Sequence, residues 1–148
     1  MRIELVLLLA FAALIGSACD EKLSDIAGPT PDLQPTLSSI QREIFNKTDS
    51  SGRTACTQCH TNAGRTPTGG LLLIEGQSYS SLVGRPSTAK PGAVLVAPGD
   101  PDNSYLLQKL EGASTIVGVR MPRGAGPFVT PGQLSIIRRW IELGAKND

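Results

Sequence analysis

The segment Cys56-Thr57-Gln58-Cys59-His60 decides how this chain is interpreted. Its C-x-x-C-H spacing places two thiols a short turn apart and an imidazole directly after them. Two such thiols can form thioether bonds with the vinyl groups of one haem, and the adjacent histidine can then bind the iron. The segment therefore predicts one covalent haem c, with Cys56 and Cys59 as attachment residues and His60 as an axial iron ligand.

Two other roles of a cysteine pair remain as alternatives. A zinc site uses about four ligands, and Cys19, Cys56, Cys59 and His60 are the only cysteines and histidine in the chain. A redox-active dithiol of the thioredoxin type is expected between a strand and a helix. Here a polar loop, 49–53, precedes the first cysteine of the pair instead.

The N-terminal residues have the pattern of an export signal. Arg2 precedes an apolar run, 5–15, and small residues follow it at 16–18. This pattern predicts a signal peptide over 1–18. The run is short for a helix that spans a bilayer, which is the alternative interpretation. The sequence therefore predicts an exported protein of the periplasm or cell envelope.

Cys19 stands where bacterial lipoproteins carry a lipidated cysteine, and the segment 14–19 resembles a lipobox. Gly16 occupies a position where that pattern has an aliphatic residue, so ordinary signal cleavage after Ala18 is the alternative. Acyl chains on Cys19 would anchor the protein to a membrane. With haem on the other two cysteines, no thiol would then remain for a disulfide.

The rest of the chain predicts a tether followed by one small domain. Residues 19–36 are polar and acidic, contain three prolines and lack an apolar period, as expected of a flexible tether. Residues 37–148 have the length of a single domain. The chain has only 4% aromatic residues beside 16 Gly and 11 Pro, so a haem would add apolar surface to a thin core. A formal net charge of +1 gives no indication of nucleic-acid binding.

Apolar spacing predicts a first helix over 36–47 and a second helix from Pro101 to about Leu110, with Asp100 as its cap. Between them, an apolar run at 71–74 allows a short two-stranded β element with 94–97. A turn of helix is expected around 79–83.

The last helix is expected to begin at Thr130, which forms a capping box with Gln133, and to end at Gly144. Glu142 is expected to pair with Arg138 one turn earlier. Its apolar stripe is expected to comprise Leu134, Ile136, Ile137, Trp140, Ile141 and Leu143.

Met121 is the only methionine left after removal of the signal peptide. It lies in a long Gly-rich segment, 111–129, and Pro122 follows it. A thioether is a suitable sixth ligand for low-spin haem iron, so Met121 is expected to bind opposite His60. The alternative is that Met121 fills a gap in the core, the common role of a methionine.

These features together resemble the class I c-type cytochromes over residues 37–145. The resemblance rests on a first helix with the aromatic Phe45, the C-x-x-C-H segment, a Met-Pro loop and a C-terminal helix. It implies an all-α, cytochrome-c-like fold around one covalent haem, with the last helix packed across the first. In this chain Cys56 follows Phe45 by eleven positions, a longer link than in compact members of the class.

With both axial positions filled by His60 and Met121, the iron has no open site for a substrate. The expected function is therefore one-electron transfer with redox protein partners, not catalysis. The first alternative is a haem enzyme, or a sensor of a gas or peroxide, in which Met121 does not bind. The second is a structural lipoprotein without haem.

Four arginines lie in segments expected to border the haem. They would either steer an acidic redox partner or neutralise the haem propionates. These residues are Arg53, Arg65, Arg120 and Arg123.

Overall fold

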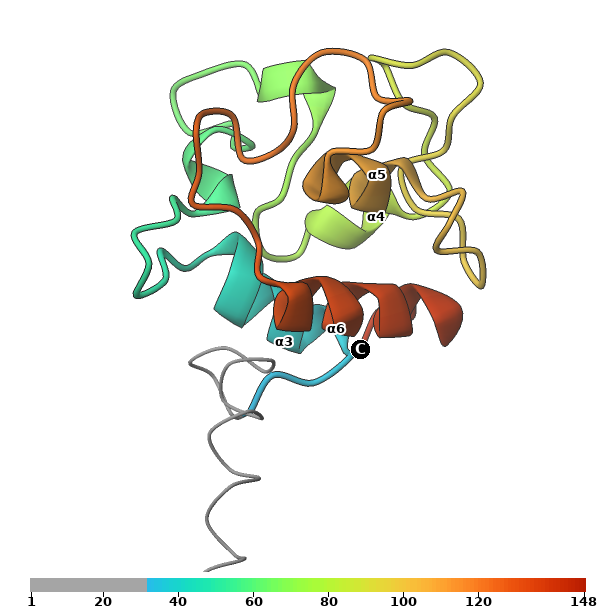
Figure 1. Cartoon of the computed structure of the whole chain (residues 1–148), viewed down its shortest axis with the longest axis horizontal. Coiled ribbons are helices and arrows are strands. Elements are labelled where there is room, and N and C mark those ends of the chain that lie inside the picture. The colour runs from blue at the N-terminus through green and yellow to red at the C-terminus, as the bar shows by residue number, and fades with distance from the viewer. Residues whose placement is uncertain (1–31) are drawn as a thin grey trace, which may run out of the picture.

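The computed structural model describes residues 32–148 (Figure 1). The predicted signal peptide over 1–18, the predicted lipidation site Cys19 and most of the predicted tether lie outside the described residues. In the part of the chain that the structure describes, no helix combines the length and apolar character needed to cross a membrane.

The described residues are mostly helical, in agreement with the predicted all-α class, and their β structure is limited to isolated bridges. The elements are α3 (Leu37–Ile40), the π-helical η1 (Gln41–Phe45), the short 3-10 helices η2 (Cys56–Gln58) and η3 (Thr68–Gly70), α4 (Ser78–Leu82), α5 (Tyr105–Glu111) and α6 (Pro131–Glu142).

The first predicted helix is confirmed as α3 and η1, which follow each other without a break. Thr36 caps it, because its hydroxyl accepts a hydrogen bond from the amide of Ser39 at 3.3 Å. Ile40 and Ile44 point into the core and are almost completely buried. The carboxylate of Asp148 accepts a hydrogen bond from the amide of Leu37 at 2.9 Å, so the end of the chain lies against the start of this helix.

The capping box of the last helix is confirmed. The hydroxyl of Thr130 accepts from the amide of Gln133 at 3.2 Å, and the side-chain oxygen of Gln133 accepts from the amide of Thr130 at 3.1 Å. Most of the predicted stripe of α6 faces the core. Leu143 is the exception: it follows the helix as its C-cap and remains 45% exposed.

The predicted pair between Glu142 and Arg138 is wrong. The guanidinium of Arg138 donates to Asp102 at 2.5 Å and to Glu111 at 3.1 Å, while Glu142 pairs with Arg139. Glu111 at the end of α5 and Asp102 in the turn before α5 both lie beside Arg138, so Arg138 pairs with them and not with Glu142 on its own helix.

The helix predicted from Pro101 begins later, at Tyr105. The carboxylate of Asp100 accepts from the amide of Asn103 at 3.2 Å, which closes a local turn before the helix. The hydroxyl of Ser104 adds bonds to Ala97 and to the carbonyl of Asp100. Polar side chains that bond nearby backbone groups compete with helix formation, which explains the delayed start.

The predicted pairing of 71–74 with 94–97 is also wrong. Val96 bridges Val83 and Val94 bridges Pro86, so the segment after α4 is the true partner. The segment 71–74 instead forms a backbone hydrogen bond with His60 of the C-x-x-C-H segment, because the amide of Leu73 donates to the carbonyl of His60 at 2.9 Å.

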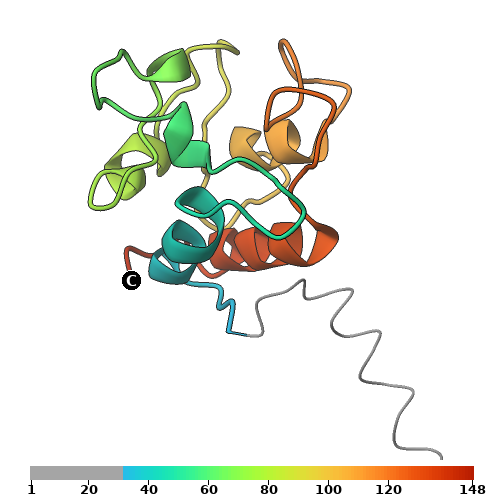
Figure 2. The same ribbon diagram turned by 90° about the vertical axis from the view of Figure 1, so that its left-hand side faces the viewer.

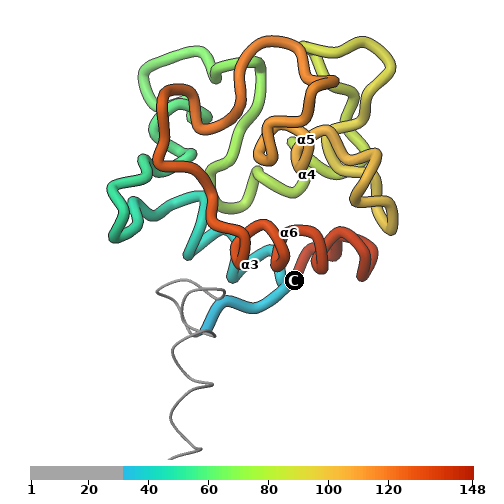
Figure 3. Tube along the Cα trace, viewed as in Figure 1, coloured from blue at the N-terminus to red at the C-terminus, as the bar shows by residue number. Residues whose placement is uncertain are grey.

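Helix α6 contacts both α3 and α5, as expected for a last helix that packs across the first. The Cα trace shows α6 along one side of the domain, with α4 and α5 above it (Figure 3). The loop after η1 lies beside the helices at the left of Figure 1, and the loop after α5 runs above them. The core thus forms a base, and the loops carry the predicted site residues.

Candidate functional site

Cys56, Cys59 and His60 lie on one tight turn. The carbonyl of Cys56 accepts hydrogen bonds from the amides of Cys59 at 3.2 Å and of His60 at 3.0 Å. These bonds close η2, so the two thiols and the imidazole project from a single turn of backbone. Both cysteines are free thiols, and Cys59 is exposed while Cys56 is partly buried.

Cys56 packs against the base of the domain. Its thiol donates to the carbonyl of Ile44 at 3.7 Å, which links the turn to η1. Burial raises the pKa of the Cys56 thiol, although the nearby guanidinium of Arg53 opposes the shift. The thiol of Cys56 is therefore held in a fixed place beside the first helix, whereas that of Cys59 faces solvent.

The imidazole of His60 is partly buried and suited to bind a metal. Burial lowers its pKa, and backbone groups of Leu71 and Thr68 oppose that shift. A neutral imidazole at physiological pH offers one nitrogen as a ligand. Its Nδ1 atom is buried and has no hydrogen-bond partner among residues 32–148.

Two backbone bonds hold the segment around His60 in place. The carbonyl of His60 accepts from Leu73, and the carbonyl of Cys59 accepts from Thr68 at 3.3 Å. The residues that follow the motif therefore fold back onto it. This return explains why 71–74 is unavailable for the predicted β element.

Met121 lies on the separate loop between α5 and α6 and is partly buried against the core. Its amide donates to the carbonyl of Lys109 at 2.9 Å. The ammonium group of Lys109 donates in turn to the carbonyls of Val117, at 3.0 Å, and Val119. The hydroxyl of Tyr105 accepts from the amide of Val117 at 2.9 Å. Helix α5 thus fixes the loop that carries Met121.

The structure brings the three residues of the motif together and leaves Met121 on another segment. The motif (green) and the loop after α5 (orange to red) lie on the same side of the domain, and both are seen in Figure 2. Cys56 and Met121 both pack against the same core cluster.

The four arginines that were expected to border the haem differ in their surroundings. Arg53 is completely buried, and Arg65 and Arg123 are exposed. Arg65 donates to the carbonyl of Gln58 at 3.1 Å. The guanidinium of Arg120 lies 4.0 Å from the centre of the Phe128 ring, and its Nε donates to the carbonyl of Leu110 at 2.7 Å. Arg53 is therefore not available at the surface to steer a partner.

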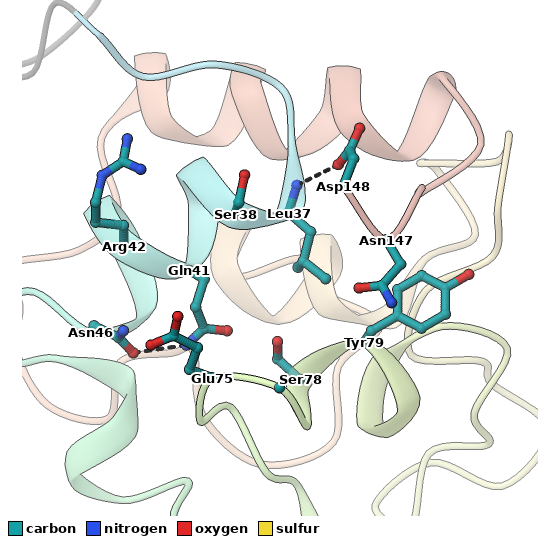
Figure 4. A pocket seen from close by; sticks show the side chains of 11 residues that line it. Leu37, Ser38, Gln41, Arg42, Asn46, Glu75, Ser78, Tyr79, Asn147 and Asp148 are labelled. Carbon is teal, nitrogen blue, oxygen red and sulfur yellow. Dashed lines mark hydrogen bonds between the residues drawn. The ribbon is translucent and has the colours of Figure 1, made fainter.

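A pocket of about 380 Å³ lies away from these residues, where α3, the start of α4 and the C-terminal residues meet (Figure 4). The amide nitrogen of Gln41 donates to Asn46 and to the carbonyl of Leu73, both at 2.7 Å. The side-chain oxygen of Gln41 is buried without a partner among the described residues. None of the predicted site residues lines this pocket.

Between residues 32 and 148, no group of three or more His, Cys, Asp or Glu side chains is placed to hold a metal ion. Comparison of the chain with models of protein families, with curated proteins and with solved structures yields no match.

The residues of the site nevertheless suit a haem c. Two free thiols on one turn are the groups that form its thioether bonds, and the neutral imidazole of His60 is a suitable iron ligand. The buried Nδ1 atom of His60 has no hydrogen-bond partner among residues 32–148, so no described protein group holds this nitrogen. Met121 supplies the one thioether in the described residues.

Two features of the site were not predicted from the sequence. One is the ion pair of Asp49 with Arg53 next to Cys56. The sequence signal for it was the spacing of four residues between this acidic and this basic residue. The other is the role of Lys109 in fixing the loop of Met121. Lys109 lies in the last turn of α5, a position that also favours a cation through the helix dipole.

Proposed function

We propose that the protein is a one-electron carrier with one covalent haem c, attached through Cys56 and Cys59. The single observation that supports this most strongly is the turn that presents both free thiols and the neutral, partly buried imidazole of His60. The bound haem would supply an Fe(II)/Fe(III) couple. The protein is accordingly not an enzyme.

In this proposal His60 and Met121 would both bind the haem iron. Two protein ligands leave no open position for a substrate, and a histidine with a methionine raises the reduction potential. Hydrogen bonds to Leu73 and Lys109 hold the backbone of the two ligand residues. A site fixed in this way changes little between oxidation states, which favours electron exchange with a redox protein partner.

The proposal includes export to the periplasm or cell envelope and a lipid anchor on Cys19. An anchored carrier on a tether would meet partners near a membrane surface. The proposed partners are redox proteins, with no role for nucleic acid.

The test is expression of the full chain in a bacterium that matures c-type cytochromes. The denatured product is expected to keep a Soret absorption, and its mass is expected to exceed that of the polypeptide by one haem. A Cys56→Ser, Cys59→Ser double variant should lose both signals. Absence of both signals from the unaltered chain would refute the proposal.

Cys19→Ser serves as a matched control, because it removes a cysteine outside the motif. This variant is expected to keep the haem and to move from the membrane fraction to the soluble periplasmic fraction. Unchanged membrane association of Cys19→Ser would contradict the proposed anchor and leave the haem assignment standing.

A further inference from the structure

A largely buried ion pair lies in the link between the first helix and the C-x-x-C-H turn. The guanidinium of Arg53 is 0% exposed and its Nε donates to the carboxylate of Asp49 at 3.0 Å; the Asp49 side chain is 8% exposed. The same carboxylate accepts from the amide of Arg53 at 3.1 Å and from the hydroxyl of Ser51 at 2.5 Å. The pair therefore closes the loop 49–53 on itself.

The far side of the guanidinium reaches the attachment turn. Nη1 of Arg53 lies 4.0 Å from the sulfur of Cys56 and donates to the carbonyl of Ile44 at 3.2 Å. Cys56 donates to the same carbonyl of Ile44. Arg53 thus stands between the carboxylate of Asp49 and the sulfur of Cys56, and it ties both to η1.

A cation in this place is costly to the fold. Removing two charges from water carries a penalty that their attraction often does not repay, so an apolar pair of similar volume would serve the packing as well or better. Burial raises the pKa of the Cys56 thiol, and the charge of Arg53 acts to lower it. The Arg53 charge therefore influences the Cys56 sulfur.

We propose that Arg53 is a positioning residue for the Cys56 attachment and that its buried charge raises the reduction potential of the site. This inference rests on the proposed haem c function. A positive charge beside the attachment sulfur favours the state that holds one more electron, and this Coulombic effect is strong in a buried, weakly screened place. Asp49 holds Arg53 there through Nε and offsets part of its field, while Nη1 of the same guanidinium lies 4.0 Å from the sulfur.

Because the two charges have opposite signs, removing each should shift the reduction potential in opposite directions. A mere change in packing would not produce this pattern. Asp49→Asn removes the offsetting charge and is expected to raise the potential. Arg53→Gln removes the cation, leaves the carboxylate and is expected to lower it. The Asp49→Asn, Arg53→Gln double variant, with neither charge, should lie between the unaltered protein and Arg53→Gln.

The experiment is a redox titration of the four purified holoproteins. The expected order of potentials, from high to low, is Asp49→Asn, unaltered protein, double variant, Arg53→Gln. Arg42→Gln is the matched control, because the Arg42 side chain is 62% exposed and pairs with Glu43 instead. Its potential is expected to stay at that of the unaltered protein.

Single variants that shift the potential in the same direction, or not at all, would overturn the inference. If Arg53→Gln fails to fold, the other three proteins still decide, because the double variant must lie below the unaltered protein and Asp49→Asn above it. A chain that carries no haem would refute the proposed function, whereas a haem protein with the wrong order of potentials would refute only the role of Arg53.

Discussion

The amide of Met121 donates to the carbonyl of Lys109 at 2.9 Å, and the side chain of the same lysine bonds two carbonyls of the loop that leads to Met121. Lys109 of α5 therefore holds this loop through hydrogen bonds from both its backbone and its side chain. The loop is irregular, yet its course is fixed by a helix.

Met121→Ala tests the proposed sixth ligand. The variant should keep its covalent haem, because Cys56 and Cys59 are intact, but lose the absorption band in the red that arises from methionine bound to ferric iron. Its reduction potential should fall, since the thioether favours the reduced state. An unchanged spectrum would rule out Met121 as a ligand. A high-spin ferric spectrum with ready cyanide binding in the unaltered protein would favour an open-site haem protein.

Lys109→Gln tests whether α5 holds the Met121 loop. Loss of the charged bonds to Val117 and Val119 should destabilise the loop by about 1 kcal/mol. Amide hydrogen exchange over 113–121 should rise, while exchange in α6 should stay the same. Lys47→Gln, which loses an exposed ion pair with Glu43, is the control and should leave exchange of the loop unchanged. Equal exchange of the loop in both variants would contradict this role.

Gly112→Ala tests the close approach between the end of α5 and the loop. Gly112 has a φ of +75°, and an added Cβ would lie 2.8 Å from Cδ of Arg120. The variant should lose about 2 kcal/mol of unfolding free energy, measured by urea denaturation. Gly118→Ala is the control, because its φ is also +75° but no atom lies within 4 Å of the added Cβ. Equal losses would show that contact with Arg120 has no cost.

Asp49→Asn tests the acid sensitivity of the buried pair. Burial alone would raise the pKa of Asp49, but hydrogen bonds from Ser51 and Arg53 together with the charge of Arg53 hold it below its ordinary value of 3.8. A carboxylate with a lowered pKa contributes stability above 3.8, and this contribution is lost as the pH falls through the folded-state value.

The unaltered protein should therefore be more stable than Asp49→Asn at neutral pH, by about 3 kcal/mol. This difference in unfolding free energy should become smaller as the pH falls from about 5 toward about 2. Urea denaturation across this range measures it, and a constant difference would show that Asp49 is not the titrating group.

Local sequence determined the elements whose signals do not depend on the rest of the chain. The capping box of Thr130 and Gln133 formed as predicted, because both partners belong to one turn. The first helix also formed where Leu37 and Ile40 indicated it. The turn of Cys56, Cys59 and His60 is similarly local, since its closing bonds span four residues or fewer.

The sequence predictions were wrong where a group had several possible partners. The partners of Arg138 depended on how α5 and the turn before it pack against α6. The β partner of Val96 depended on how 71–74 returns to His60. The sequence alone offers several suitable partners for each of these groups. Only packing decides which of them is near.

The sequence by itself determined the mostly helical class, the main helices and the residues that we propose to hold a haem, because spacing along a chain fixes periodicity, caps and motifs. Tertiary structure alone decided that Arg53 is buried against Cys56 and that Lys109 holds the loop of Met121. Burial and long-range hydrogen bonds depend on which segments meet, and the hydrophobic core that joins α3, α5 and α6 determines that meeting.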